Sequence, residues 1–209
     1  MTSLPLHLLP RTAAVDDHGA LTIGGLSVVE LAAEFGTPLF VYDETHLRDR
    51  CREAVDAFGH QQAIYATKAF LCTAMARLAY EEGMLLDVAS GGEMHVALAA
   101  GVPPDALTLH GNNKSVSELR TALTEGIRYV VVDCDEEIDR IEALVAEGLP
   151  RPNVVLRITP GVHAHTHEYI ATGQDDSKFG FNLGNGAAHA AVERTQRSSA
   201  MELLSLIHI

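Results

Sequence analysis

The chain has 209 residues, 47% of them hydrophobic, and a formal net charge of −13. This much apolar material can bury a core, so the composition argues against disorder, and the length allows one or two domains. A charge this negative argues against a nucleic-acid or anionic-membrane surface, because both need clustered Lys and Arg. We therefore expect no nucleic-acid and no membrane partner, and the composition fits a soluble enzyme.

The cysteines and the N-terminus indicate the compartment. Cys51, Cys72 and Cys134 are odd in number, far apart and in no C-x-x-C pair. This number and spacing of cysteines point to a reducing compartment, and they contain no pattern of zinc ligands. The N-terminus lacks the layout of a signal peptide, and no apolar run reaches membrane-spanning length. The sequence therefore predicts a cytoplasmic protein.

Two helices are predicted before residue 60. Ser27 and Glu30 have the spacing of a capping box, and the apolar positions that follow continue a helix until Gly36. Asp43 can cap the next helix, which has one apolar face and ends at Gly59.

From residue 63 the chain alternates short apolar runs with helical patterns that end in glycine. The unit repeats roughly every 22–25 residues, the size of a β/α step, which indicates a parallel sheet. Further capping boxes open two of the helices, at Ser90 with Glu93 and at Ser115 with Glu118. The runs that we predict to be buried strands are 63–66, 85–89, 107–109, 129–132 and 154–158.

This alternation is typical of an α/β fold, either a parallel barrel or an open doubly wound sheet. No G-x-G-x-x-G follows the first strand, which weakens the dinucleotide-binding form of the open sheet. A (β/α)₈ barrel typically needs about 250 residues, and here the rhythm starts near residue 60. We therefore expect a barrel cut short after about five β/α units.

Charged side chains lie at the ends of the predicted strands or within them. Lys68 directly follows the first strand, where an amine could form a Schiff base; the alternative is an ordinary surface lysine at the start of a helix. Asp87 and Arg157 lie inside apolar runs, where a charge is costly unless it is paired or used. His110 follows the third strand. A lysine, a carboxylate and a guanidinium that converge on a barrel mouth suit an imine-forming cofactor.

Two other patterns are weaker. His163, His165 and His167 alternate and could face one way on a strand, but the glycines that flank them favour a loop, so we predict no metal site. The glycine-rich stretch 180–186 lacks the G-K-[ST] ending of a phosphate loop.

Four segments carry a recognisable pattern: YATKAF (65–70), LDVASGGE (86–93), LHGNNKS (109–115) and HTHEYI (165–170). Together they resemble diaminopimelate decarboxylase, in the fold-type III pyridoxal-phosphate family, whose catalytic domain is an alanine-racemase-type barrel. The lysine and Ser-Gly-Gly-Glu motifs are shared with ornithine and arginine decarboxylases, and the other two are closer to the diaminopimelate branch. The resemblance covers about residues 20–195.

The resemblance implies a lyase that removes CO₂ from meso-2,6-diaminopimelate to give L-lysine, the last step of lysine biosynthesis. Lys68 would hold pyridoxal 5′-phosphate as an imine and would be the catalytic residue, and Asp87 would sit near that lysine and the cofactor ring. The positions that it assigns to the cofactor pocket are Lys68, Ala66, Asp87, Glu93, Arg157 and His110.

The resemblance also implies parts that the 209 residues lack. They are a histidine that stacks on the cofactor ring, a glycine-rich phosphate loop, and a C-terminal β-domain whose cysteine acts as proton donor across the interface of a homodimer. We therefore expect this chain alone to be inactive and to fold poorly, since five strands leave two exposed edges.

The expected division has three parts. Residues 1–42 form an N-terminal segment that packs partly on the β-domain of the whole enzyme, and residues 43–203 form the partial barrel. Residues 204–209 match what a sequencing-library adapter encodes when read in frame, so we expect a tail foreign to the protein; the alternative is a natural apolar strand.

Two kinds of alternative remain from the sequence. One is another fold-type III decarboxylase acting on ornithine, arginine or carboxynorspermidine. The other is a non-catalytic relative that binds pyridoxal phosphate or a protein partner, against which the presence of Lys68 argues.

Overall fold

The computed structural model describes residues 6–161 and 179–208, whose contacts divide the chain into two units. The first unit is Met1–Ala63 with Glu82–Met84, and the second is Ile64–Glu81 with Leu85–Ile209. The boundary predicted between residues 42 and 43 falls inside the first unit. As a boundary of the whole protein it stays a prediction.

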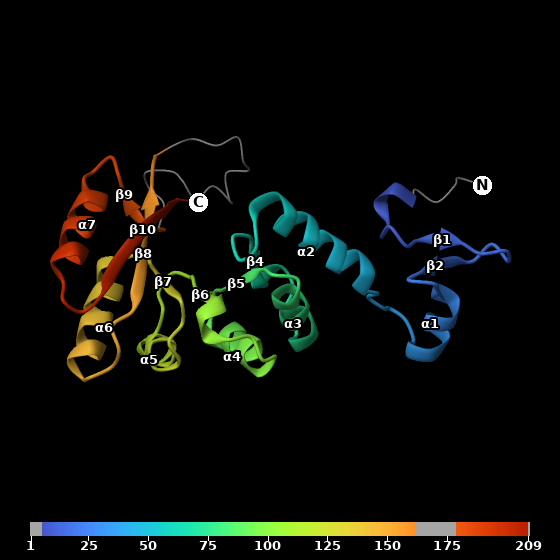
Figure 1. Cartoon of the computed structure of the whole chain (residues 1–209), viewed down its shortest axis with the longest axis horizontal. Helices are drawn as coiled ribbons and strands as arrows, with labels where there is room; N and C mark the ends of the chain where they lie inside the picture. Colours follow the sequence, from blue (N-terminus) through green and yellow to red (C-terminus); the bar gives the residue numbers. More distant parts are fainter. Residues whose placement is uncertain (1–5, 162–178, 209) are drawn as a thin grey trace. The chain divides into compact units, whose positions relative to one another are not determined.

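The first unit contains a small antiparallel sheet in the order β1-β2-β3 and two longer helices (Figure 1). Glycines with φ of 60° and 81° form the turn between β2 and β3, a conformation that favours glycine. Its elements are η1 (Leu6–Leu8), β1 (Ala14–Val15), β2 (Leu21–Ile23), β3 (Leu26–Ser27), α1 (Val28–Phe35) and α2 (Glu44–Phe58).

The helix ends in this unit test the predicted caps. Asp43 caps α2 as expected, because its carboxylate accepts a hydrogen bond from the His46 N–H at 3.1 Å. Ser27 is the N-cap residue of α1, but its side chain makes no capping hydrogen bond, so the capping box predicted there is wrong. Gly36 and Gly59 follow the last residues of the two helices, as predicted.

Residues 82–84 join the first unit through Glu82. The Glu82 carboxylate accepts from Arg52 Nε at 2.6 Å and from Arg48 Nη1 at 2.7 Å, so it is clamped to α2. The hydrogen bond from Arg52, and then the one from Arg48, hold the pKa of Glu82 below its ordinary value.

The second unit is a parallel sheet whose strands alternate with helices along most of the chain (Figure 1). Its strands are β4 (Ile64–Ala66), β5 (Leu85–Val88), β6 (Leu107–Leu109), β7 (Tyr129–Val132), β8 (Asn153–Thr159), β9 (Phe181–Asn182) and β10 (Glu202–His208). Its helices are η2 (Thr67–Ala69), α3 (Thr73–Glu81), α4 (Gly91–Ala99), η3 (Pro104–Ala106), α5 (Val116–Glu125), α6 (Asp135–Ala146) and α7 (Ala187–Arg197).

The order of the strands decides between the two predicted architectures. All strand pairs in this sheet are parallel, and the order β4-β5-β6-β7-β8-β10 follows the chain, with β9 paired to the end of β8. A doubly wound sheet would reverse its order at a switch point, whereas a barrel adds each strand beside the last. The α/β barrel type predicted from the sequence is confirmed.

The five predicted strands match β4 to β8 within two residues, and the structure adds two more. β9 has only two residues, too few for a periodic pattern. β10 runs parallel to β8 with a register irregularity between Leu203 and Ser205, and it includes most of the expected foreign tail. The pairing does not bear on the origin of residues 204–209, which stays a prediction.

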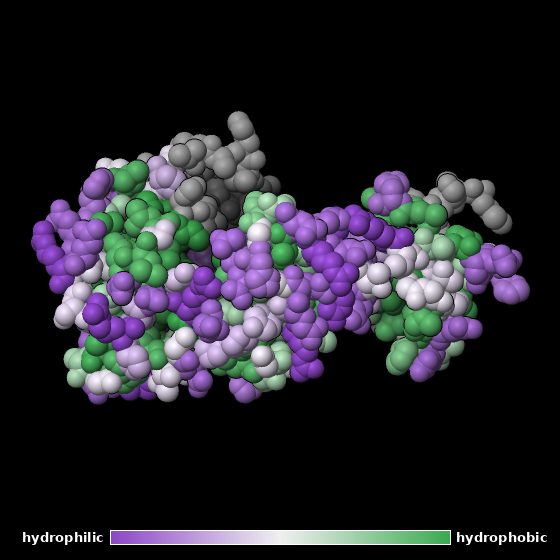
Figure 2. Space-filling model, in the orientation of Figure 1, coloured by the Kyte–Doolittle hydropathy of each residue, from purple (hydrophilic) through white to green (hydrophobic). Residues whose placement is uncertain are grey.

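The core lies between the sheet and its helices. Leu86, Leu107 and Leu156 on the strands and Ile138 and Ile141 on α6 are fully buried. Edge strand β10, in contrast, leaves Leu204 and Leu206 about half exposed, and Figure 2 shows a hydrophobic area over this strand. No helix in the described ranges is long and apolar enough to cross a membrane.

Candidate active site

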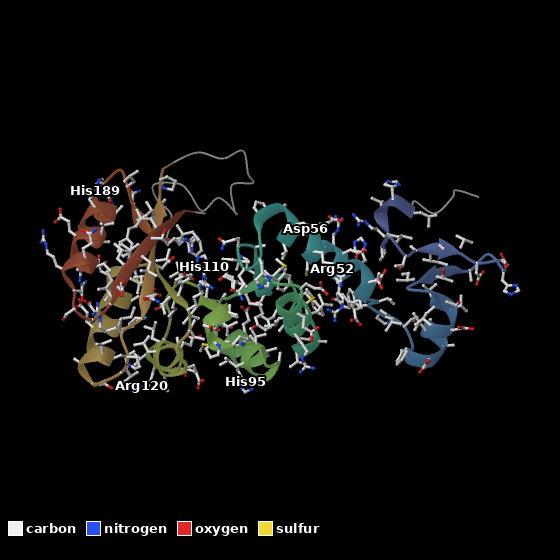
Figure 3. All side chains as sticks on the ribbon, in the orientation of Figure 1. Arg52, Asp56, His95, His110, Arg120 and His189 are labelled. Carbon is white, nitrogen blue, oxygen red and sulfur yellow. The ribbon has the colours of Figure 1, made fainter. Side chains whose placement is uncertain are left out.

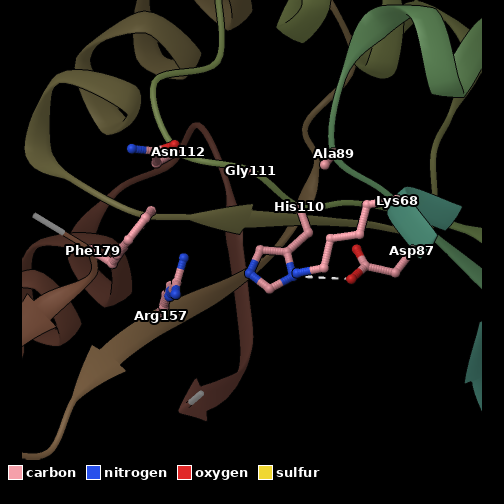
Figure 4. Close-up of a pocket in the computed structure, with 8 residues that line it drawn as sticks. All are labelled: Lys68, Asp87, Ala89, His110, Gly111, Asn112, Arg157 and Phe179. Carbon is pink, nitrogen blue, oxygen red and sulfur yellow. Dashed lines mark hydrogen bonds and ion pairs between the residues drawn. The ribbon is translucent and has the colours of Figure 1, made fainter. Parts of the chain in front are cut away.

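A cavity of about 200 Å³ lies where β4, β5 and β6 end, with β8 beside it (Figure 4). Because parallel strands present their carboxyl ends at one edge of the sheet, side chains far apart in sequence meet there. The structure thus brings together four residues that the sequence singled out. The cavity is lined by Lys68, Asp87, Ala89, His110, Gly111, Asn112, Arg157 and Phe179.

Lys68 reaches this cavity from the short helix η2, immediately after β4. Its neighbour Thr67 is buried, and the Thr67 hydroxyl lies 2.8 Å from both the Asp87 carbonyl oxygen and Glu93 Oε2. The threonine therefore fixes the turn to β5 and α4, while the Lys68 side chain stays exposed on the cavity.

Glu93 and Ala66 do not line the cavity. Glu93 Oε2 accepts from the Ala89 N–H at 2.6 Å as well as from Thr67, and Ser90 Oγ accepts from the Glu93 N–H at 3.3 Å. Only half of the predicted capping box is thus present, since the carboxylate turns to Ala89 and Thr67. The roles predicted for Glu93 and Ala66 in cofactor binding stay predictions.

Asp87 and His110 form a pair on one side of the cavity. His110 Nδ1 lies 3.2 Å from Asp87 Oδ2, joining β5 to the loop after β6. The other polar atom of each side chain, Asp87 Oδ1 and His110 Nε2, is buried without a hydrogen-bond partner among the described residues. Buried polar atoms are normally satisfied, so these two indicate a polar ligand in the cavity.

Arg157 faces His110 across the cavity (Figure 4). Its Nη1 donates to Asp133 Oδ1 at 3.2 Å, and its guanidinium carbon lies 4.5 Å from the centre of the Phe179 ring. The buried charge is therefore paired with Asp133, at the end of β7, rather than with Asp87. No sequence pattern marks Phe179, which precedes the two-residue strand β9.

The loop that carries His110 is tightly packed. Gly111 has a φ of 142°, and a Cβ atom there would lie 2.5 Å from the Ala89 carbonyl oxygen. Ser115 then opens α5 with the predicted capping box, in which its hydroxyl accepts from the Glu118 N–H. Glu118 also accepts from the Gly91 N–H at 2.8 Å, and the N–H groups of Ser115 and Gly91 hold the pKa of Glu118 below its ordinary value.

Other histidines lie away from this site. Figure 3 shows His95 and His189 apart from His110, and both are exposed, on α4 and α7. Within residues 6–161 and 179–208, no group of three His, Cys, Asp or Glu side chains could hold a metal ion. The predicted segment 165–170 and the histidines beside it lie outside the described residues.

The cavity has the groups that an imine-forming cofactor needs. It presents a primary amine, an acid–base pair with two unsatisfied polar atoms, and a guanidinium held in place by an aromatic ring and a carboxylate. These residues fit a ligand that has a carbonyl carbon, polar ring substituents and negative charge.

A comparison with known families identifies this class. The family described as "Pyridoxal-dependent decarboxylase, pyridoxal binding domain" matches residues 44–209. The chain belongs to this family, and the cofactor predicted from the sequence, pyridoxal phosphate, is confirmed by that membership.

The particular relatives are diaminopimelate decarboxylases. The chain is 48% identical to the enzyme of Mycobacterium leprae over 204 residues, which are 97% of this chain and 43% of the relative. It is 48% identical to that of Bacillus subtilis over 202 residues, 95% of this chain and 46% of the relative. The crystal structure of the enzyme from M. jannaschii in complex with L-lysine matches with a TM-score of 0.84 and 31% identity, over 95% of this chain and 48% of that one. The chain therefore spans less than half the length of these relatives.

Proposed function

We propose that this chain is the cofactor-binding part of a diaminopimelate decarboxylase, which removes the carboxylate at the D-centre of meso-2,6-diaminopimelate and releases L-lysine and CO₂. The observation that carries the proposal is the cavity in which Lys68 faces the Asp87–His110 pair and Arg157. The identity of 48% with two diaminopimelate decarboxylases supports this substrate over other diamino acids.

Lys68 is the proposed covalent anchor. Its primary amine stands at the carboxyl end of β4, and the buried Thr67 beside it fixes the turn. Lys68 would hold pyridoxal phosphate at its carbonyl carbon, and its amine could also hold or move a proton beside the substrate. When bound, the cofactor supplies the electron sink for loss of CO₂.

The Asp87–His110 pair supplies acid–base and hydrogen-bonding groups. A carboxylate 3.2 Å from Nδ1 favours the tautomer that carries its proton on that nitrogen. His110 Nε2 is then left to accept a hydrogen bond from the ligand, and Asp87 Oδ1 is a second acceptor without a partner among the described residues.

Arg157 is the proposed anion-binding group. Asp133 accepts a hydrogen bond from one guanidinium nitrogen of Arg157 at 3.2 Å, and the Phe179 ring packs on the guanidinium plane. The Arg157 side chain is therefore held in place before any ligand binds. A fixed guanidinium binds a carboxylate or a phosphate with little loss of side-chain freedom. It therefore orients an anionic group of the substrate or cofactor.

The test uses the full-length product of the gene with added pyridoxal phosphate. We expect a visible absorption band from the covalently held cofactor and lysine formation from meso-diaminopimelate, both lost in Lys68→Ala. Lys68→Arg is the matched variant, since it keeps the charge and length but lacks a primary amine. His95→Ala, an exposed change on α4, is expected to retain both signals.

Each other outcome has a definite meaning. A Lys68-dependent band without lysine would move the substrate to ornithine, arginine or carboxynorspermidine, and these are assayed in parallel. An unchanged band in Lys68→Arg would remove Lys68 from its assigned role. The absence of any band in the wild-type protein would refute the whole proposal.

Two finer points belong to this proposal. The resemblance to diaminopimelate decarboxylases supports a homodimer, which sedimentation of the full-length protein would test. Cys51, Cys72 and Cys134 are free thiols, which supports a reducing cytoplasm as the location.

A further inference from the structure

Glu137 is a buried carboxylate near the cavity that does not line it. It lies in the first turn of α6, and its side chain has no exposed surface. Oε1 accepts from the Lys114 backbone N–H at 2.8 Å. Oε2 accepts from Lys114 Nζ at 2.8 Å and from the Asp133 N–H at 3.0 Å. Such a charge is costly to bury unless it is paired and hydrogen-bonded, as it is here.

One side of this carboxylate holds the loop that carries His110. Lys114 Nζ donates to the Gly111 carbonyl oxygen at 2.6 Å as well as to Glu137, and its side chain is 2% exposed. On the other side of the loop, Gly111 approaches the Ala89 carbonyl oxygen too closely for a Cβ atom. The loop is therefore fixed between α6 and the residue that follows β5.

The other side of the carboxylate holds the wall that carries Arg157. The backbone N–H of the buried residue Asp133 donates a hydrogen bond to Glu137. The Asp133 carboxylate in turn pairs with Arg157 at 3.2 Å. A continuous set of bonds thus runs from Gly111 through Lys114, Glu137 and Asp133 to Arg157. Both of its ends line the cavity.

We propose that Glu137, with Lys114, is a positioning residue that sets the spacing between His110 and Arg157, and so the geometry of the site. This inference rests on the proposed function for what the site binds. A buried ion pair can often be replaced by neutral side chains of similar volume with little loss of stability. Stability alone therefore does not require this pair to be charged. Loss of the pair should therefore affect cavity geometry separately from stability.

The experiment compares Glu137→Gln with the double variant Lys114→Met/Glu137→Gln in the full-length protein. The single variant leaves the Lys114 ammonium buried without a counter-charge, so its melting temperature falls. The double variant removes that charge and recovers most of the melting temperature. Glu136→Gln is the matched control, because it removes the same charge from the same helical turn at an exposed position.

Two further measurements separate positioning from stability. In the cofactor-free protein, we expect amide hydrogen exchange in residues 110–114 to be about tenfold faster in the double variant than in wild type. We expect its Kd for pyridoxal phosphate to rise about tenfold, with a shift of the absorption maximum. Glu136→Gln changes neither.

The outcomes distinguish this inference from the proposed function. If the double variant regains wild-type exchange, affinity and spectrum together with its stability, the pair is structural only and the inference is overturned. If the wild-type protein binds no pyridoxal phosphate, the proposed function fails, and the exchange rates of the cofactor-free variants still decide whether Glu137 fixes the loop. If Glu137→Gln does not accumulate as folded protein, Lys114→Met/Glu137→Gln carries the comparison.

Discussion

Gly111→Ala tests the packing of the His110 loop most directly. A Cβ atom at this position would lie 2.5 Å from the Ala89 carbonyl oxygen and 3.3 Å from its carbonyl carbon. Both are backbone atoms, which cannot turn aside as the end of a long side chain can. The φ of 142° adds strain for any L-residue.

The expected magnitude combines these two effects. Backbone strain of this kind costs about 1–3 kcal/mol and an overpacked contact a similar amount, so we expect Gly111→Ala to lower the free energy of unfolding by about 3 kcal/mol. Gly101→Ala is the matched control. Its φ of 84° is also positive, but no atom lies within 4 Å of the added Cβ, so only the conformational cost of about 1 kcal/mol applies.

Urea unfolding of the two cofactor-free variants measures the difference directly, and titration with pyridoxal phosphate reports on the cavity. We expect Gly111→Ala to unfold at lower urea than Gly101→Ala and to bind the cofactor more weakly, since Gly111 lines the cavity. Equal midpoints for the two variants would refute the reasoning, because they would show that the loop moves off Ala89 without cost.

Two further predictions concern charged caps and clamps. Glu118, whose pKa is lowered by the N–H groups of Ser115 and Gly91, stabilises the fold above its unfolded-state pKa of about 4.3, and this contribution is lost as the pH falls through its lower folded-state pKa. We therefore expect the free energy of unfolding of Glu118→Gln, measured with urea, to be about 1 kcal/mol lower than that of wild type at pH 6. The difference is expected to shrink as the pH falls below about 4, and a difference independent of pH would contradict this. In the first unit, Glu82→Gln breaks the clamp to Arg52, and we expect thermal unfolding to show a loss of about 1 kcal/mol, whereas an unchanged melting temperature would show that the pair adds nothing.

The local pattern of the sequence was sufficient for the elements of the second unit. Short apolar runs separated by glycine-terminated helices predicted β4 to β8, because the apolar residues of a strand form a local signal in the sequence. The structure buries β5, β6 and β7 as expected, whereas β4 is only partly covered. The capping box at Ser115 and Glu118 and the cap at Asp43 were also predictable, since a cap involves residues three apart in the chain. Ser27 shows the limit of such signals, because the spacing is present without the hydrogen bond.

The meeting of Lys68, Asp87 and His110 could also be foreseen. Each lies at or near the end of a predicted strand, and parallel strands place these ends together. The sequence thus predicted that these residues meet at one cavity, and it indicated the kind of cofactor. It also indicated the family, through motifs spread along the chain.

Only the tertiary structure decided which charges pair. Arg157 pairs with Asp133 rather than Asp87, and Lys114 pairs with Glu137, in each case across 23 or 24 residues. Such pairs depend on the register of neighbouring strands and on the turn of the helix between them, neither of which leaves a local signal. The sequence determined the strands and the groups available at their ends, whereas the packing of one β/α step on the next determined which of those groups face the cavity and which hold it in shape.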